Sequence, residues 1–342
     1  MPLALFLLGT VTACGDEPTS NAVDASPDAP DDTAASPLIG SYEVSSITND
    51  DDEGLFREET KWLQFNADNV FMGFWQKSKG YRGITRELFL ATPTQVVINY
   101  AIYNYTLEGD RLVIENFDTR IEATRSTSSP SEDMWAPMMS ITQQVMVDEP
   151  DAYDLEWDGG AFWYSTYEEL RRVSFPTGEV LDTLPTNSAR ALGWDGTNLW
   201  VSYNGYDTLN RVDLDTGNRI FTSASVGAWP YSMAWDGSHF WVYSSSEQAL
   251  VRYDPAANSA VETIPREDLG TTWLGGIAIW NGELWLSAEG GIHRCTLAPF
   301  AVVASYQVDG AYAEGLATDG TALYAFTRKL GVYSISRLAI SP

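Results

Sequence analysis

The chain has 342 residues, carries a formal net charge of −27 and is 44% hydrophobic. Its length allows two ordinary domains. Its strong negative charge repels nucleic acid and anionic lipid surfaces, which excludes nucleic-acid binding. It contains two histidines and two cysteines, so a His-rich or Cys-rich zinc site is excluded as well.

The first residues predict a targeting segment, residues 1–14. Residues 3–13 form an apolar run that is too short to span a bilayer permanently but has the length of a signal-peptide core. The sequence Val11-Thr12-Ala13-Cys14 resembles the lipobox of bacterial lipoproteins, which implies that Cys14 is lipidated and becomes the mature N-terminus. The lack of a preceding Lys or Arg departs from that pattern, and an ordinary signal peptide with an incidental cysteine is the alternative.

Residues 15–37 predict a disordered, acidic, proline-rich tether. They hold four prolines and six acidic residues but no aromatic residue, too little apolar surface to offset the entropy of ordering. We expect this segment to hold the folded part off a membrane. Gly15, not Asp, follows Cys14, which favours the outer membrane of a bacterial cell envelope as the location.

Residues 38–131 predict a small antiparallel β-barrel of about six strands. Alternating runs start at Tyr42, residues 95–101 read QVVINYA, and Gly109 marks the turn of the hairpin YTLEGDRLVI. The opening LIGSY and this hairpin resemble lipocalin-like domains, which implies a barrel that could take a small apolar ligand. A barrel filled by its own side chains is the alternative. Residues 49–54, NDDDEG, lack EF-hand spacing and are interpreted as a solvated hairpin tip.

Residues 138–342 contain five copies of one pattern and predict a β-propeller. The copies read LEWDGGAFWYS, LGWDGTNLWVS, MAWDGSHFWVY, IAIWNGELWLS and LATDGTALYAF. Their Asp or Asn turn residues are 37, 41, 45 and 38 positions apart, the period of a four-stranded blade. Asp-Gly and Asn-Gly favour tight hairpin turns, and the aromatic residue of the second strand suits packing between blades.

The fifth copy reaches the end of the sequence before a full fourth strand. Residues 141–148 parallel the segment that precedes the last repeat, so we expect them to complete the last blade and close the ring. Closure would protect the sheet edges. Five blades are favoured, with six as the alternative, so the predicted fold class is all-β: a small antiparallel lipocalin-like barrel followed by a β-propeller.

Aromatic residues gather in the loops that we expect on one face of the propeller. In a propeller the connections from strand four to strand one and from strand two to strand three share a face, which forms the mouth of the central channel. The predicted ligand-binding residues there are Tyr153, Asp154, Arg190, Trp229, Tyr231, Trp273, Tyr312 and Glu314. Aromatic anchors with an Arg and carboxylates suit binding, and packing of loop against loop is the alternative.

No catalytic residue is predicted. His239 sits beside the turn at Asp236, on the face opposite the mouth, and His293 lies in a strand. Cys295 lies in the same strand, between Arg294 and Thr296. Because no histidine adjoins it to activate the thiol, a buried inert thiol is expected. No glycine-rich phosphate loop is present.

One resemblance bears on enzyme activity. The segment from Phe162-Trp163-Tyr164-Ser165-Thr166 to Thr177-Gly178-Glu179-Val180 is similar to the first blade of propeller-type glutaminyl cyclotransferases. In that family a Glu stands where this chain has Tyr164, the signature Phe-Thr-Gln-Gly-Leu is replaced by DAYDL, and the propeller here has a single Lys, Lys329. These departures remove acid–base groups. Likeness to strictosidine-synthase-like and lactonase propellers implies calcium in the channel, with ligands that the sequence does not identify.

Three functions remain open at this stage. The first is a non-enzymatic, lipid-anchored envelope protein, expected to be monomeric, whose propeller binds a protein, peptide or carbohydrate. The second is a glutaminyl cyclotransferase-like or hydrolytic enzyme at the channel mouth. The third gives the barrel a lipophilic ligand. No cofactor other than the implied calcium is expected.

Overall fold

The computed structural model describes residues 36–49, 60–128, 130–147, 152–271, 273–297, 299–308, 311–329 and 332–340. The predicted signal peptide, Cys14, residues 15–35 of the tether and residues 50–54 of the predicted hairpin tip lie outside these ranges. Residues 36–342 form one compact unit. None of the helices within the described ranges is both long and apolar enough to cross a membrane.

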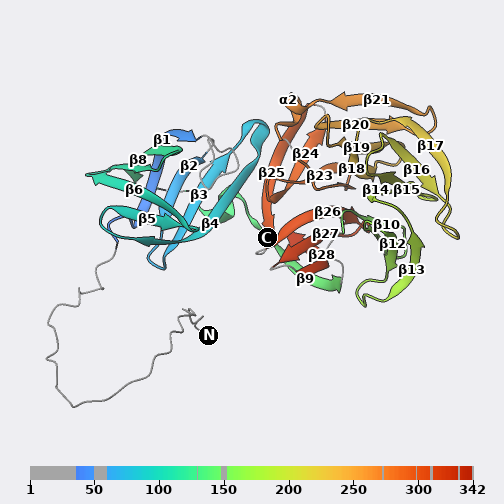
Figure 1. Ribbon diagram of the computed structural model, residues 1–342, viewed down its shortest axis with the longest axis horizontal. Coiled ribbons are helices and arrows are strands. Elements are labelled where there is room, and N and C mark those ends of the chain that lie inside the picture. The colour runs from blue at the N-terminus through green and yellow to red at the C-terminus, as the bar shows by residue number, and fades with distance from the viewer. Residues whose placement is uncertain are drawn as a thin grey trace, which may run out of the picture. The chain divides into compact units, whose positions relative to one another are not determined.

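The first part of this unit is a closed antiparallel barrel of eight strands (Figure 1). It closes because β1 pairs with β2 on one side and with β8 on the other. The strands are β1 (Gly40–Asn49), β2 (Thr60–Phe65), β3 (Val70–Gln76), β4 (Arg82–Ala91), β5 (Gln95–Ile98), β6 (Ala101–Glu108), β7 (Arg111–Glu115) and β8 (Thr119–Ser126).

The expected number of barrel strands, about six, was too low. The run at residues 95–101 is divided between two strands, because Asn99 and Tyr100 both have positive φ values, 46° and 68°, and form the turn between β5 and β6. This pair of positive φ angles is that of a two-residue hairpin turn. A tyrosine in the left-handed region gives no turn signal in a sequence, so the break was missed.

Aromatic and aliphatic side chains of the barrel pack against one another on its inner side. The ring of Phe65 lies 5.1 Å from that of Phe71 and 5.1 Å from that of Phe89, measured between centroids. At one end the hydroxyl of Tyr42 donates to the carbonyl oxygen of Leu38 at 3.0 Å. One contiguous apolar cluster therefore joins the strands of the barrel.

The second part consists of five four-stranded blades. In the first four blades the strands follow chain order from the inside outward, whereas in the fifth the early strand β9 is the outermost. The first three are β10 (Leu155–Trp157), β11 (Phe162–Ser165), β12 (Glu169–Val173), β13 (Val180–Pro185); β14 (Ala189–Trp194), β15 (Leu199–Tyr203), β16 (Thr208–Val212), β17 (Arg219–Ser225); and β18 (Pro230–Trp235), β19 (Phe240–Ser244), β20 (Ala249–Asp254), β21 (Ser259–Ile264). The last two are β22 (Gly276–Trp280), β23 (Glu283–Ala288), β24 (Gly291–Leu297), β25 (Phe300–Val308); and β26 (Tyr312–Thr318), β27 (Leu323–Lys329), β28 (Val332–Ile340), with β9 (Met138–Val147).

The ring is closed by the early strand, as the repeat pattern predicted. β9 pairs antiparallel with β28, from Tyr333 opposite Val147 to Ile340 opposite Met139. The inner strand β10 contacts both β14 and β26, so the first blade meets the second and the fifth. The prediction of an all-β chain with a five-bladed propeller is confirmed. The start of β9 also pairs in parallel with β25, which links the fourth and fifth sheets.

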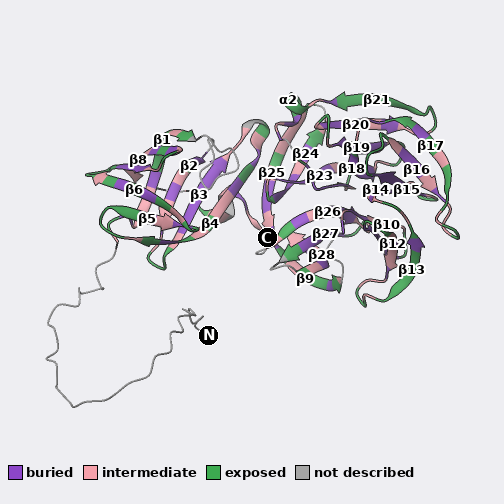
Figure 2. Ribbon diagram, viewed as in Figure 1, coloured by how far each residue is buried: buried purple, intermediate pink, exposed green. Residues whose placement is uncertain are grey.

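The repeated aromatic residue of each second strand is buried between blades. Trp163 of the first blade packs in a cluster with Leu192 and Leu199 of the second, and Trp285 of the fourth packs with Leu316 of the fifth. Burial decreases from the inner to the outer strand of a blade. Figure 2 shows that inner strands are largely buried, whereas the outer strands β13, β17 and β21 are mostly exposed. Apolar burial between neighbouring blades therefore stabilises the ring.

An aspartate at the first hairpin of a blade accepts several hydrogen bonds. In the second blade, Asp195 accepts the N–H of Thr197 at 2.9 Å, the N–H of Asn198 at 2.7 Å and the indole N–H of Trp200 at 2.7 Å. Asp158 and Asp319 bond to the aromatic residue five positions later in the same way. The four-residue turn is thus tied to the buried aromatic side chain.

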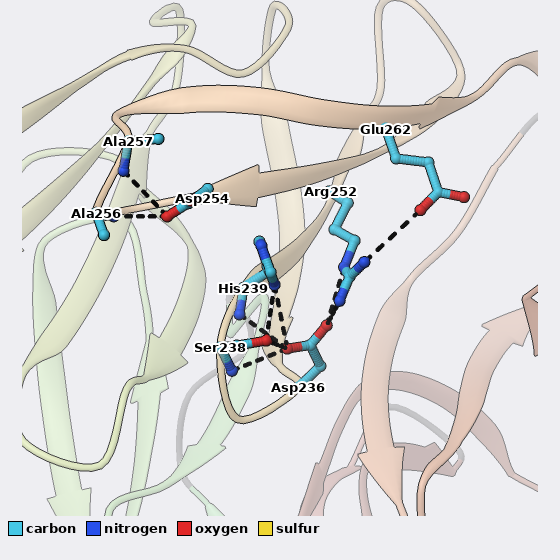
Figure 3. Close-up of polar contacts among 8 residues, drawn as sticks. All are labelled: Asp236, Ser238, His239, Arg252, Asp254, Ala256, Ala257 and Glu262. Atoms are coloured by element: carbon cyan, nitrogen blue, oxygen red, sulfur yellow. Dashed lines mark hydrogen bonds and ion pairs between the residues drawn. The ribbon is translucent and has the colours of Figure 1, made fainter.

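The third and fourth blades depart from this arrangement. Asp236 accepts the N–H groups of Ser238 and His239, and Arg252 replaces the indole as donor to its second oxygen (Figure 3). In the fourth blade Asn281 and Gly282, both with positive φ, make a two-residue turn. That turn brings no carboxylate to Trp285, whose indole N–H has no hydrogen-bond partner among the described residues.

We expect Asp195→Ala to lower the free energy of unfolding by about 2 kcal/mol, because it leaves the buried indole N–H of Trp200 without an acceptor. Burial raises the pKa of Asp195, but the hydrogen bonds from Trp200 and Asn198 outweigh it, so the pKa lies below the usual value. The contribution is therefore present at neutral pH and is lost as pH falls through the folded pKa. Urea unfolding at several pH values measures it.

Asp213 provides the control for this variant. Its carboxylate accepts the N–H groups of Asp215 and Thr216 in an exposed turn, without an aromatic donor. Asp213→Ala should cost less than Asp195→Ala. Equal losses would show that the bond to Trp200 contributes nothing.

The turn between β3 and β4 contacts the fourth blade. Tyr81, fully buried, follows the short helix η1 (Ser78–Gly80), and its ring lies 4.8 Å from the ring of His293 in β24. Lys77 pairs with Glu289 at 3.0 Å, and Lys79 pairs with Asp268 of helix α2 (Arg266–Leu269) at 3.1 Å. A second short helix, α1 (Glu132–Trp135), precedes β9.

Candidate functional site

The predicted mouth residues lie just before the inner strands or within their first residues. Tyr153 precedes β10, Arg190 lies at the start of β14, Tyr231 lies in β18, and Glu314 lies in β26. These four positions correspond to one another in the repeats, so each blade except the fourth contributes one large polar or aromatic side chain. The fourth blade has Gly275 at this place and supplies Trp273 just before it.

Arg190 forms the centre of the mouth. Its guanidinium carbon lies 3.6 Å from the ring centroid of Tyr153 and 5.9 Å from that of Tyr231. The ring of Tyr231 in turn lies 6.2 Å from that of Trp273, nearly edge to face. We call Tyr153, Arg190, Tyr231 and Trp273 the mouth cluster. Stacking of this kind holds the guanidinium in one place while leaving its edge available for hydrogen bonds.

The electrostatic surroundings of Tyr231 indicate which groups converge. Burial raises the pKa of Tyr231; Arg190 acts in the opposite direction, and the carboxylates of Glu314 and Asp154 act in the same direction as burial. Burial also raises the pKa of Glu314, and this is partly offset by Arg328, whose Nε lies 3.9 Å from a Glu314 oxygen.

Asp154 occupies a different position from the other seven predicted residues, because its side chain is fully buried. One carboxylate oxygen accepts the backbone N–H of Leu192 at 2.9 Å, and the other accepts the hydroxyl of Ser232 at 3.2 Å. Ser232 Oγ accepts the N–H of Ile277 at 3.0 Å. This chain of contacts crosses four inner strands, β10, β14, β18 and β22, so Asp154 joins blades.

The remaining members of the predicted set are exposed. Tyr312 lies 5.8 Å from Arg328, measured from its ring centroid to the guanidinium carbon. Trp229 is 54% exposed and has a positive φ of 57°, and no ring contact joins it to the mouth cluster. The backbone N–H of Trp229 donates to the backbone carbonyl oxygen of Tyr206 at 3.2 Å. The structure thus brings Tyr153, Arg190, Tyr231 and Trp273 together and leaves Trp229 further out.

Two aromatic residues of this face were missed from the sequence. Tyr167 and Tyr206 lie in connections between second and third strands and are 50% and 53% exposed. Together with Trp229, Trp273 and Tyr312 they form what we call the aromatic rim, five exposed rings in loops or at a strand start of the same face. Counting back from each Asp-Gly turn finds only the loops before the first strands. Counting forward from the second strands, to the residues after Ser165 and Tyr203, would have found the other two.

The residues of the channel do not fit a calcium ion. Calcium takes six to eight oxygen ligands. The oxygens of Asp154 are already used by Leu192 and Ser232. Glu156 is the next carboxylate along β10, and among the described residues no group of three or more His, Cys, Asp or Glu side chains could hold a metal ion.

The two histidines and the thiol lie away from the mouth cluster. His239 contacts Ser238 beside the Asp236 turn (Figure 3). His293 is fully buried, and burial lowers its pKa to about 4. Cys295 is buried and unpaired, and burial raises the pKa of its thiol. Tyr164 is buried too, with its ring 6.0 Å from that of Phe326.

The fold has known relatives. The structure is similar to the crystal structure of Myxococcus xanthus glutaminyl cyclase. The likeness has a TM-score of 0.51 and 15% sequence identity, and it covers 60% of this chain and 98% of the cyclase. At this identity it shows the fold alone, which agrees with the propeller predicted from the repeats.

Two further structures match less closely. Hydrazine synthase of Kuenenia stuttgartiensis has a TM-score of 0.35 and 20% identity, over 54% of this chain and 57% of that one. The Cps50 (Swd1) β-propeller domain of Myceliophteria thermophila has a TM-score of 0.36 and 15% identity, over 59% of this chain and 68% of that one. No family model and no curated protein matches the sequence.

Proposed function

We propose that the propeller is a binding platform for a peptide or protein segment, carried on a lipid-anchored protein of the bacterial cell envelope. The observation that supports it most is the mouth cluster, where Arg190 stacks on Tyr153 beside Tyr231 and Trp273. Tyr, Trp and Arg are the residues enriched at the energetic centres of protein interfaces. The aromatic rim shares Trp273 with this cluster and adds four further exposed rings, which cost little entropy to immobilise.

The lipid anchor at Cys14, the tether of residues 15–37 and the outer-membrane location are parts of this proposal. They are supported by the lipobox-like VTAC and by the acidic, proline-rich composition after it. Mass spectrometry of the mature N-terminus tests the anchor: an unmodified Cys14 still joined to Ala13 would remove it.

Binding is tested with the full chain carrying Cys14→Ser, probed against a peptide array and a glycan array. We expect Trp273→Ala with Tyr312→Ala to weaken binding to the best peptide about tenfold or more, because exposed aromatic anchors dominate such interfaces. Titration of the immobilised peptide gives the affinities. The matched control removes two exposed aromatic residues of the barrel, Tyr100→Ala with Phe117→Ala, and should leave the affinity unchanged.

Two outcomes contradict the proposed platform. Equal losses in the mouth variant and in the barrel control would mean that the mouth does not carry binding. Selective capture of glycans with no peptide bound would replace the peptide by a carbohydrate ligand.

An enzyme at the same mouth is the second candidate. It is favoured by Glu314, a carboxyl at the mouth whose pKa is raised by burial, because raised carboxyl pKa values are common among catalytic acids and bases. The structural relative is a glutaminyl cyclase, so the assay is release of ammonia from a peptide with N-terminal glutamine. Turnover that Glu314→Gln abolishes would favour the enzyme. The platform proposal expects no turnover above the uncatalysed rate.

A further inference from the structure

Across three neighbouring barrel strands, a row of outward-facing residues is apolar where a soluble barrel usually carries polar residues. In β4, Phe89 points to the buried cluster, so its neighbours Leu88 and Leu90 point outward. Leu90 pairs with Val97 of β5, and Val97 pairs with Ile102 of β6. These residues form a continuous row across β4, β5 and β6, and both faces of this part of the sheet are therefore apolar.

This row is strongly exposed and continues onto two turns. Leu88, Leu90 and Ile102 are 72%, 70% and 59% exposed, and Tyr100 and Phe117 are each 96% exposed. Tyr100 lies in the turn just before β6, and Phe117 lies just after β7. Because β6 and β7 are antiparallel neighbours, both turns are at the same end of the barrel. We call Leu88, Leu90, Tyr100, Ile102 and Phe117 the barrel patch.

The segment that supplies most of the patch has no charge. Residues 88–107 contain no Asp, Glu, Lys or Arg, although the whole chain is 20% charged and would place about four in twenty residues. A charged side chain inside this patch would oppose contact with any apolar phase, because it would lose its hydration. Contiguous exposed apolar patches of this kind mark interaction sites.

The position of the patch in the chain favours a lipid bilayer as the partner. The barrel is the first described structure after the tether, and twenty-one residues separate Cys14 from Ser36. Extended, they reach at most about 75 Å, so a lipid attached at Cys14 would keep the barrel within that distance of the membrane surface. Aromatic side chains at exposed tips suit the boundary between water and lipid.

We infer that the barrel patch docks onto the surface of a zwitterionic lipid bilayer, which replaces the expectation that the tether holds the whole folded part off the membrane. Tyr100 and Phe117 enter the headgroup region from the two turns, and the row of Leu88, Leu90 and Ile102 lies against it. The net charge of −27 makes anionic lipid unfavourable, so zwitterionic lipid is the expected surface. This contact goes beyond the binding at the propeller mouth and uses the proposed anchor only to argue proximity.

The test uses the full chain carrying Cys14→Ser, so that no acyl chain contributes. The probes are vesicles of phosphatidylcholine alone and vesicles that also contain phosphatidylglycerol, with flotation as the measurement. We expect the protein to float with phosphatidylcholine vesicles and to bind the anionic ones more weakly. Leu90→Glu with Ile102→Glu should lower the partition coefficient about tenfold or more.

A matched pair of substitutions separates the loss of apolar contact from the added charge. Ile220→Glu with Val261→Glu makes the same chemical change at residues that are 52% and 50% exposed on the outer propeller strands β17 and β21. This control should float like the parent, and equal thermal unfolding of all three proteins shows that they are folded. Equal loss in both variants would overturn the inference.

Two other results would also overturn it. The first is failure of the Cys14→Ser chain to float with either vesicle. The second is a dimer in solution that Leu90→Glu with Ile102→Glu dissociates, since the patch would then be an interface between copies. Neither result bears on the propeller mouth, so this inference and the proposed binding platform can fail separately.

Discussion

Asp154→Ala is expected to lower the free energy of unfolding by about 3 kcal/mol, as measured by urea unfolding at neutral pH. The inner strand of each blade has a neighbouring strand on one side only, so its backbone groups on the channel side need other partners. Asp154 supplies acceptors for the N–H of Leu192 and the hydroxyl of Ser232 in two other blades. An alanine leaves both donors buried without those bonds, and it removes the contact that connects the first three blades.

Stability should also depend on pH through this carboxyl. Burial raises the pKa of Asp154 well above its usual value, against the hydrogen bonds from Leu192, Leu155, Ser232 and Met233. As pH rises above about 4, the unfolded chain loses this proton before the folded chain does. The unfolding free energy attributable to Asp154 therefore falls from about pH 4 upward, until the folded group ionises as well.

Asp154→Asn is the control that separates charge from hydrogen bonding. Its amide oxygen can still accept the N–H of Leu192, and it has no proton to lose in this pH range. We expect it to cost less than Asp154→Ala and to make the unfolding free energy vary less between pH 4 and 7. An asparagine variant with the same pH dependence as the parent would assign that dependence to other groups.

Gly276→Ala is expected to destabilise the propeller by about 3 kcal/mol or more. A Cβ atom at this position would lie 2.4 Å from the carbonyl oxygen of Glu314 and 2.4 Å from the nitrogen of Leu316. Both are backbone atoms of β26 in the next blade, and no side-chain rotation can move them away. The fourth and fifth inner strands would have to separate, which strains the closed ring.

Gly160→Ala is the matched control for this substitution. Its added Cβ would meet only side-chain atoms, Arg172 Nη2 at 3.3 Å and Asp158 Oδ1 at 3.6 Å. We expect a small change there and a clear fall in the thermal unfolding temperature for Gly276→Ala. Similar unfolding temperatures for the two variants would mean that the inner strands can move apart at little cost.

Much of the fold follows from patterns that are local in sequence. The period of about forty residues, the Asp-Gly turns and the aromatic residue of each second strand predict four-stranded blades, because each hairpin is specified by residues close together in the chain. The matching segment at residues 141–148 predicts closure, which β9 confirms. The barrel was less predictable, since Asn99 and Tyr100 turn the chain without a glycine or proline.

The candidate site, too, is partly predictable from local sequence patterns and partly visible only in the structure. The repeats identify the loops that reach the mouth, and thereby Tyr153, Arg190, Tyr231 and Trp273, but they do not show that Arg190 stacks between two rings. They place Asp154 in the same loop as Tyr153. Only the structure shows that it is buried and bonded to Leu192, which lies 38 residues away.

The sequence by itself determined the repeat, the blade hairpins, the buried aromatic residues and the face on which the variable loops lie. The tertiary structure decided what happens between blades: the role of Asp154, the need for glycine at Gly276 and the exposure of the barrel patch. The physical reason is the distance along the chain between the residues that interact. Hairpins depend on residues a few positions apart, whereas contacts at the channel and solvent exposure depend on which distant strands the closed ring and barrel bring together.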